Sequence, residues 1–257
     1  MRILLLNQAP RTEKRGPAYE VASIEKLVNS YASPGTQIEI GFPDNFEGAE
    51  IFHTLGAQSN LNGLHHMMEA PAIVRKIVWA AENGYDAVIS SNTFDPGVDG
   101  GRLAVNIPVI GPLRTAMHAG LTLADRIGLT VPLASHVPYT RRILRSYGLE
   151  HFVTGIEPIG IYGKDVKARK DEIFRTTCTL IRGLVDQGAE IIVPLGGALI
   201  PYVVDPAELA AATGVQVLNT KAICVRFAEM CVSLRMTQSA LTYPRAKLSA
   251  DDFAARS

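Results

Sequence analysis

Short apolar runs alternate along the chain with longer stretches in which apolar residues recur at helical spacing. We predict strands at residues 3–6, 37–41, 87–89, 107–110, 127–131, 153–161, 188–193 and 215–219. Helices are predicted at residues 18–31, 72–83, 113–125, 140–147, 171–185, 206–212 and 220–235. Unbroken apolar runs of this length are typical of parallel strands that are covered on both faces. The alternation of such strands with helices predicts an α/β fold.

One strand–loop–helix–strand unit occurs twice. The segment from Gly84 onward matches the segment from Gly188 onward, so that Asn92 pairs with Gly196, and residues 107–111 match residues 215–219 after a short gap. Any two units of this kind share such a pattern, which is the alternative explanation. We predict two similar lobes, each with a short parallel sheet, and a cleft between Asn92 and Gly196.

The lobe boundaries follow from this repeat. Residues 1–111 together with 218–240 form the first lobe, and residues 112–217 form the second. Residues 241–257 are expected to form a C-terminal tail that lies on a neighbouring subunit, which predicts a homo-oligomer.

Composition excludes several classes of partner. The 257 residues are 47% hydrophobic and 19% charged, with 25 basic and 25 acidic residues, so a packed core is expected and a nucleic-acid partner is not. No apolar run approaches the roughly 20 residues of a membrane span. The first residues turn polar too soon for a signal peptide, which predicts a cytoplasmic protein without a membrane partner. The three cysteines fall on predicted helices, where small buried side chains are the expected interpretation.

Polar residues follow the predicted strands at the edge where open α/β sheets bind ligands. These candidates are Asn7, Ser91, Asn92, Thr93, Ser135, His136 and Tyr139. Ser135 and the backbone N–H groups after it would suit a carboxylate at a helix N-terminus. His136 and Tyr139 are side chains fit for acid–base chemistry, although capping and packing are equally compatible with them.

Two further groups of polar residues were considered. Arg114 lies near a predicted helix start, where a cation is disfavoured, so it is expected to meet an anionic ligand or an acidic neighbour. His65, His66 and Glu69 lie close together in the sequence, and His66 and Glu69 could share a helix face. Because no third ligand is near in sequence, we expect neither a metal nor another cofactor.

Several pieces of sequence together resemble the aspartate/glutamate racemase superfamily, in particular its hydantoin and allantoin racemase branch. They are MRILLLN at 1–7, DPG at 95–97, IPVIG at 107–111, MH at 117–118 and GAEIIV at 188–193. The resemblance spans residues 1–235. It implies two flavodoxin-like lobes related by a pseudo-twofold axis and cofactor-free chemistry beside a carboxylate or carbonyl. It also implies two catalytic cysteines, but Asn92 and Gly196 stand at their positions.

Three functions are compatible with this pattern. The first is an enzyme with changed chemistry, a lyase, decarboxylase or ring-opening hydrolase acting on a small carboxylate or cyclic amide. In it, Asn92 would donate to a developing oxyanion, Gly196 would leave room for substrate, and His136 with Tyr139 or a histidine of the 65–66 pair would move the proton. The substrate would be bound by Asn7, His66, Ser91, Thr93, Arg114, Ser135, Gly196 and Gly197. The alternatives are a racemase without thiols and a binding protein without catalysis.

Overall fold

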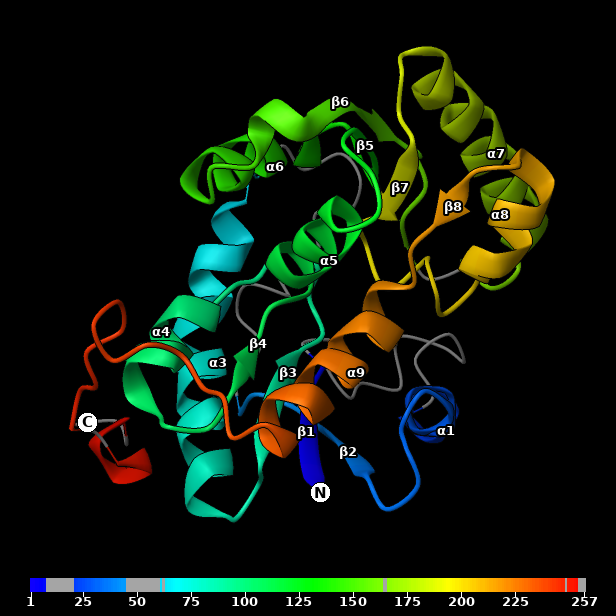
Figure 1. The fold of residues 1–257 in the computed structure, drawn as a ribbon. Coiled ribbons are helices and arrows are strands. Elements are labelled where there is room, and N and C mark those ends of the chain that lie inside the picture. Colours follow the sequence, from blue (N-terminus) through cyan, green and yellow to red (C-terminus); the bar gives the residue numbers. More distant parts are fainter. Residues whose placement is uncertain (8–20, 45–60, 62, 164–165, 248, 254–257) are drawn as a thin grey trace.

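Two four-stranded parallel sheets form the framework of the chain (Figure 1). The computed structural model describes residues 1–7, 21–44, 61, 63–163, 166–247 and 249–253. The first sheet has the order β2 (Gln37–Gly41), β1 (Arg2–Leu6), β3 (Ala87–Ser90) and β4 (Val109–Ile110). The second has the order β6 (Val153–Pro158), β5 (Ile127–Val131), β7 (Ile191–Pro194) and β8 (Gln216–Val217). Because corresponding strands occupy the same places, the predicted α/β fold with two similar lobes is confirmed.

Helices cover both sheets. Their bounds are α1 (Val21–Ser30), α3 (Leu64–Glu82), α4 (Val98–Ala104), α5 (Pro112–Leu121), α6 (His136–Ser146), α7 (Lys170–Asp186), α8 (Pro206–Thr213) and α9 (Thr220–Ser233). Short 3₁₀ turns lie at η4 (Glu150–Phe152) and η5 (Ala250–Phe253). None of the described helices is both long enough and apolar enough to span a bilayer.

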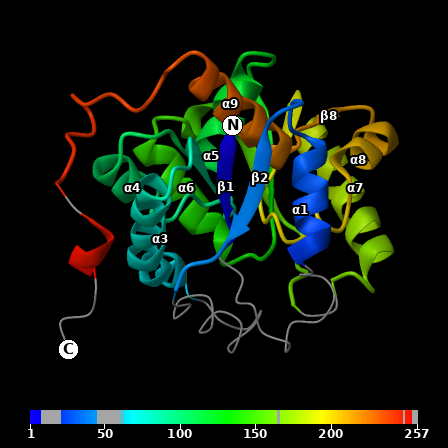
Figure 2. The ribbon, with the colours of Figure 1, turned by 90° about the horizontal axis from the view of Figure 1, so that it is seen from below.

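The inner strands β1 and β3 of the first sheet are buried on both faces because they are almost entirely apolar. Ile3 and Leu5 of β1 pack with α1 and α9, whereas Leu4 and Leu6 pack with α3 and α4. This follows from the strand period, since successive side chains point to opposite faces. Figure 2 shows α3 and α1 on either side of β1 and β2. Helix α9 returns from the second lobe to pack on β3 and β4.

The second sheet is covered in the same way. Helices α7 and α8 pack on one face, and α5 and α6 pack on the other. Phe94, from the loop after β3, belongs to the apolar cluster of α5 and α6. The first lobe therefore inserts a side chain into the core of the second, which fixes the two strand-end regions relative to each other.

Two helices begin earlier than predicted. Helix α3 begins at Leu64 and contains Pro71, which we had placed before a helix starting at residue 72. Helix α6 begins at His136 rather than at residue 140. Both differences bring histidines into a first helical turn. The predicted helix start at residues 18–20 and most of the loop at 48–63, with His53, Asn60 and Asn62, lie outside the described residues.

The described part of the tail packs on its own chain. Ala246 donates its N–H to the carbonyl of Leu103, and the Tyr243 hydroxyl lies 3.2 Å from the Asp99 carboxylate. Segment η5 packs on α3. These contacts are with α3 and α4 of the same chain, and a contact of the tail with a neighbouring subunit stays a prediction. A homo-oligomer stays a prediction.

Candidate functional site

The loops that follow β3 and β7 meet between the lobes. The backbone N–H of Gly196 donates to Thr93 Oγ1 at 2.6 Å. Thr93 is buried, and Phe94 beside it packs in the second lobe. The carboxyl ends of equivalent strands in the two lobes therefore face each other, as predicted from the repeat.

Asn92 is held in one orientation at the end of β3. Its Oδ1 accepts the backbone N–H of Phe94 at 3.0 Å, so that Nδ2 points at His66. Nδ2 lies 3.1 Å from His66 Nδ1 and 3.5 Å from Glu69 Oε2. One amide N–H thus meets the imidazole, and the other makes only a long contact.

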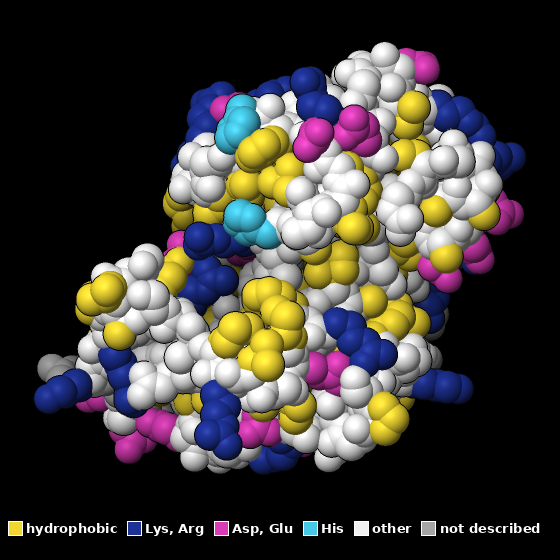
Figure 3. Space-filling model, in the orientation of Figure 1, with side chains coloured by type: hydrophobic (Ala, Val, Ile, Leu, Met, Phe, Trp, Pro, Cys, Tyr) yellow, Lys and Arg dark blue, Asp and Glu magenta, His cyan; other side chains and the backbone are white. Residues whose placement is uncertain are grey.

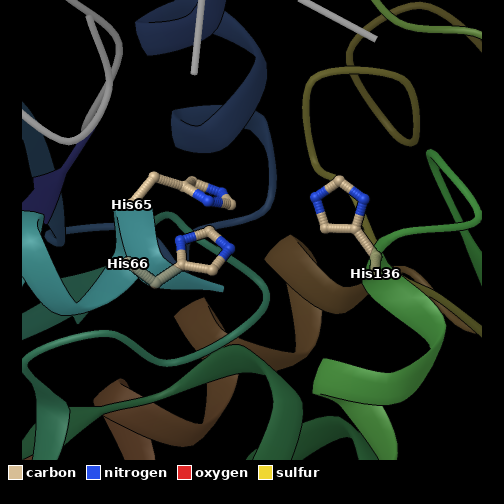
Figure 4. A group of neighbouring side chains, drawn as sticks. All are labelled: His65, His66 and His136. Atoms are coloured by element: carbon tan, nitrogen blue, oxygen red, sulfur yellow. The ribbon is translucent and has the colours of Figure 1, made fainter. Parts of the chain in front are cut away.

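Three histidines from two helices lie together, and one of them, His66, contacts this amide (Figure 4). His65 and His66 lie in the first turn of α3, and His136 is the first residue of α6. Their ring centroids lie 3.8 Å apart for His65 and His66, and 6.1 and 6.4 Å from each of these to His136. Gly63 caps α3 with φ 89°, and a β-carbon there would overlap the Tyr139 ring, so glycine lets α3 start against α6.

Burial keeps these imidazoles neutral. It lowers the pKa of His65 to about 2, of His66 to about 3 and of His136 to about 4. Neighbouring imidazoles lower the pKa of His65 and His136 further. The expectation that His136 titrates near neutral pH is therefore wrong, because its ring is almost fully removed from water. Burial also raises the pKa of Tyr139 to about 12.

At the end of β7, the two glycines differ in what they face. Gly196 has φ 90°, and a β-carbon there would overlap the Pro132 ring. Glycine is therefore needed at 196 for the positive φ and for the contact with Pro132. The room for substrate that we expected from this glycine is occupied by the Pro132 ring. A β-carbon on Gly197 would lie 3.0 Å from Lys221 Nζ and 3.6 Å from the Ser91 carbonyl oxygen. Gly197 is the position that faces the first lobe.

Lys221 is the functional candidate that sequence analysis missed. It is fully buried in the first turn of α9, and its Nζ donates to the Ser91 carbonyl and, at 3.2 Å, to Ser91 Oγ. Within the described residues it forms no ion pair with a carboxylate. Burial lowers the pKa of Lys221 to about 8, against smaller raising effects of Cys224 and Asp95. A signal existed, because a cation in the first turn of a helix opposes the helix dipole.

Asp95 lies between the strand-end loop and α5. Its carboxylate accepts the backbone N–H groups of Leu113 and Arg114 at 2.9 and 3.0 Å and the Tyr147 hydroxyl at 3.2 Å. Burial raises the pKa of Asp95 to about 6, although these donors favour the ionised form. The Arg114 guanidinium donates to the Tyr243 hydroxyl at 3.1 Å. Asp95 thus contacts the Arg114 backbone, whereas the Arg114 side chain contacts Tyr243, and its contact with an anionic ligand or an acidic side chain stays a prediction.

The remaining predicted residues lie near the cleft with less specific contacts. Asn7 is buried after β1 and donates its backbone N–H to the Gly41 carbonyl at 2.9 Å. Ser135 precedes α6 and makes no side-chain cap hydrogen bond. The Ser91 hydroxyl lies 3.4 Å from that of Tyr202.

An open pocket of about 560 Å³ borders His66. Helices α3, α4 and α6 form it, and its lining includes His66, Phe94, Asp95, Tyr139 and Tyr147. Figure 3 shows the surface hollowed between α4 and α6, with basic side chains at the edge. A small ligand in this pocket would reach the His66 side of Asn92.

The cysteines take no part in this arrangement. Cys178 lies on α7, and Cys224 and Cys231 lie on α9; all are buried. Burial raises the pKa of each thiol, that of Cys224 to about 12. Their predicted placement on helices is confirmed.

Comparison with known proteins gives the family. A model described as Asp/Glu/Hydantoin racemase matches residues 18–228. A hydantoin racemase from Rhizobium meliloti is 25% identical over 257 residues, which cover 97% of this chain and 98% of the relative. An allantoin racemase structure from Pseudomonas fluorescens has 22% identity and a TM-score of 0.78, covering 97% of this chain and 98% of that one. An arylmalonate decarboxylase structure has 15% identity and a TM-score of 0.60, covering 90% and 92%. Since the family model matches most of its length, the chain belongs to the Asp/Glu/hydantoin racemase family.

Proposed function

We propose that the protein is a racemase of a small cyclic amide or carboxylate, with Lys221 in place of a catalytic thiol. The observation that carries this proposal is the buried amine of Lys221 between Gly197 and Ser91. It lies where the carboxyl ends of β3 and β7 meet. A buried lysine without a carboxylate partner is costly for the fold, which favours a role in chemistry.

The amine can act as a base near neutral pH. With a pKa of about 8, a substantial share of Lys221 is neutral in slightly alkaline solution and can accept a proton. The substrate carbon loses that proton beside a carbonyl, and the charge moves onto the carbonyl oxygen. The weakly engaged N–H of Asn92 would donate to this oxygen. A base whose pKa lies near the working pH accepts and releases a proton efficiently. For inversion, the planar anion would then take a proton on its opposite face from water in the open pocket beside Asn92, while protonated Lys221 returns its proton to solvent.

Racemisation is favoured over the lyase, decarboxylase and hydrolase chemistry that we expected first. The curated relative reported above is named a hydantoin racemase. The decarboxylase structure supports the fold alone at 15% identity. A ring of the hydantoin or allantoin type has an acidic C–H between a carbonyl and an amide nitrogen, which suits a base of this strength.

The decisive experiment follows both the proton and the configuration of the substrate. Single enantiomers of a 5-substituted hydantoin, allantoin, aspartate and glutamate are each incubated with the protein in deuterated water. NMR measures deuterium at the α-carbon, and circular dichroism measures inversion. We expect exchange with inversion for at least one substrate, and its loss in Lys221→Met but not in Lys170→Met, a solvent-exposed control.

Other outcomes would contradict the proposal. Release of carbon dioxide or ring opening would indicate a lyase or hydrolase. Saturable binding without exchange would indicate a binding protein. Exchange that persists in folded Lys221→Met would remove Lys221 from the mechanism while leaving racemisation itself supported.

A further inference from the structure

We infer that His65, His66 and His136 form a binding site for a zinc-type divalent cation, with a fourth position open to an oxygen atom of the ligand. Each histidine offers one ring nitrogen, and these three atoms lie within 4.8 Å of one another. Figure 4 shows the rings of α3 and α6 turned toward a common space. The third donor that is missing near Glu69 in the sequence is thus provided by His136 in space.

The donor set fits a borderline metal ion. Three imidazoles with one open position are a common pattern of catalytic zinc sites. Zinc holds nitrogen at about 2.0–2.1 Å, which places tetrahedral ligands roughly 3.3 Å apart. The three nitrogens must therefore approach one another by up to about 1.5 Å, a shift that χ rotations of these side chains can provide.

Glu69 can orient one of the proposed metal ligands, His66. Its Oε2 lies 3.4 Å from His66 Nδ1, and both side chains are buried. His66 Nε2, on the other side of the ring, has no hydrogen-bond partner among the described residues. When Nδ1 donates to a carboxylate, Nε2 becomes the metal ligand, which is the usual arrangement of a carboxylate–histidine–metal series. Binding would move the Nδ1 contact from Asn92 to Glu69.

Some charges around the site disfavour a bound cation, and others favour it. The first turns of α3 and α6 point their N-termini at it, which disfavours a cation by up to about 1 kcal/mol each. Arg142, over the Tyr139 ring at 5.1 Å, also adds positive charge. Glu69 supplies one negative charge, and an anionic ligand in the adjoining pocket would supply another. The site is therefore expected to bind zinc more tightly when an enolate-like or carboxylate ligand is present.

The catalytic role of this ion rests on the proposed function, whereas its binding does not. Asn92 connects the two regions, because it contacts His66 and follows Ser91, which contacts Lys221. An ion at the histidines would hold the substrate oxygen on which charge develops.

The test measures metal directly on untagged full-length protein. Zn²⁺ is offered to the folded protein and during refolding, and affinity is determined by competition with a chromophoric chelator. We expect one Zn²⁺ per chain and a tetrahedral absorption spectrum with Co²⁺. Alanine at any one of the three histidines should weaken Zn²⁺ more than about 100-fold, and Glu69→Gln about 10- to 100-fold. His118→Ala and His151→Ala, which alter exposed histidines, should change nothing.

Two results would overturn the inference. One is the absence of stoichiometric Zn²⁺ after both loading routes, which would indicate that the imidazole N–H groups meet the ligand directly. The other is equal weakening in the cluster and control variants. If circular dichroism shows that a variant does not fold, the Co²⁺ spectrum of the wild-type protein decides instead. An octahedral spectrum would contradict the inference. Zinc binding without racemisation would contradict the proposed function alone.

Discussion

The ends of β3 and β7 carry different chemistry although the two strands occupy equivalent places. At β3, Asn92 presents an amide in contact with His66, one of three neighbouring neutral histidines. At β7, Gly197 has no side chain, and the amine of Lys221 fills the adjacent space. In both regions the groups with functional potential come from first turns of helices, α3 and α6 at one end and α9 at the other. A fold can therefore keep its cleft while the reactive groups move from strand ends to helix starts.

The largest expected effect is a loss of kcat when the proposed base, Lys221, is replaced. Lys221→Met should lower kcat about 10²- to 10⁴-fold, because it removes the acid–base group and keeps an apolar stem of similar length. In the wild type, kcat/KM should rise with pH through about 8, since the amine must be neutral to accept a proton. Initial rates from pH 5 to 10 test both statements. A folded variant with the wild-type profile would contradict them.

The next prediction concerns the Asn92 end. Asn92→Ala should lower kcat about 10²- to 10³-fold, with a smaller change in KM, because it removes a donor to developing charge. The pH profile should keep its inflection, since Lys221 is unchanged. Asn106→Ala, at an exposed asparagine, is the matched control. Equal activity of the two variants would show that the amide is not used.

The two glycines allow a direct comparison of fold and function. Gly196→Ala should lower the free energy of unfolding by about 2–4 kcal/mol, because it adds strain at positive φ and overlap with Pro132. Gly197→Ala should leave stability nearly unchanged but lower kcat, because its β-carbon presses on the Lys221 amine. Urea unfolding and steady-state kinetics on both variants test this. The opposite assignment of effects would contradict the geometry at β7.

A smaller effect, on the pH dependence of kcat/KM, is expected from the charge of Asp95. The Asp95 carboxylate raises the pKa of Lys221, and with its own pKa near 6 it is ionised where Lys221 titrates. Asp95→Asn should therefore move the inflection in kcat/KM to lower pH. An unchanged inflection, or one at higher pH, would show that Asp95 does not act on the amine.

The smallest effect is expected from the thiols. A variant with alanine at Cys178, Cys224 and Cys231 should keep most activity, since all three are buried on helices and burial raises the pKa of each thiol, which disfavours the reactive thiolate. Alkylation of the native protein should likewise do little. An essential thiol would require a different site from the one described.

Unbroken apolar runs predicted the inner strands well because β1, β3, β5 and β7 are buried on both faces. Helix starts were harder to place. Pro71 suggested a helix start but lies inside α3, so His65 and His66 were assigned to a loop. The contact of these residues with His136 depends on how α3 meets α6, which local pattern does not encode. Lys221 escaped attention because a lysine on an amphipathic helix is ordinarily solvated.

The close approach of Gly197 and Lys221 constrains how this site can evolve. A β-carbon at position 197 would sit 3.0 Å from the Lys221 amine, tighter than ordinary van der Waals contact, and a sulfur would add further bulk. A cysteine at 197 and a lysine at 221 therefore compete for one space. Replacing Gly197 alone with cysteine gives a crowded site, and replacing Lys221 alone with a small residue leaves the space empty. The two positions are therefore expected to change as a pair across lineages.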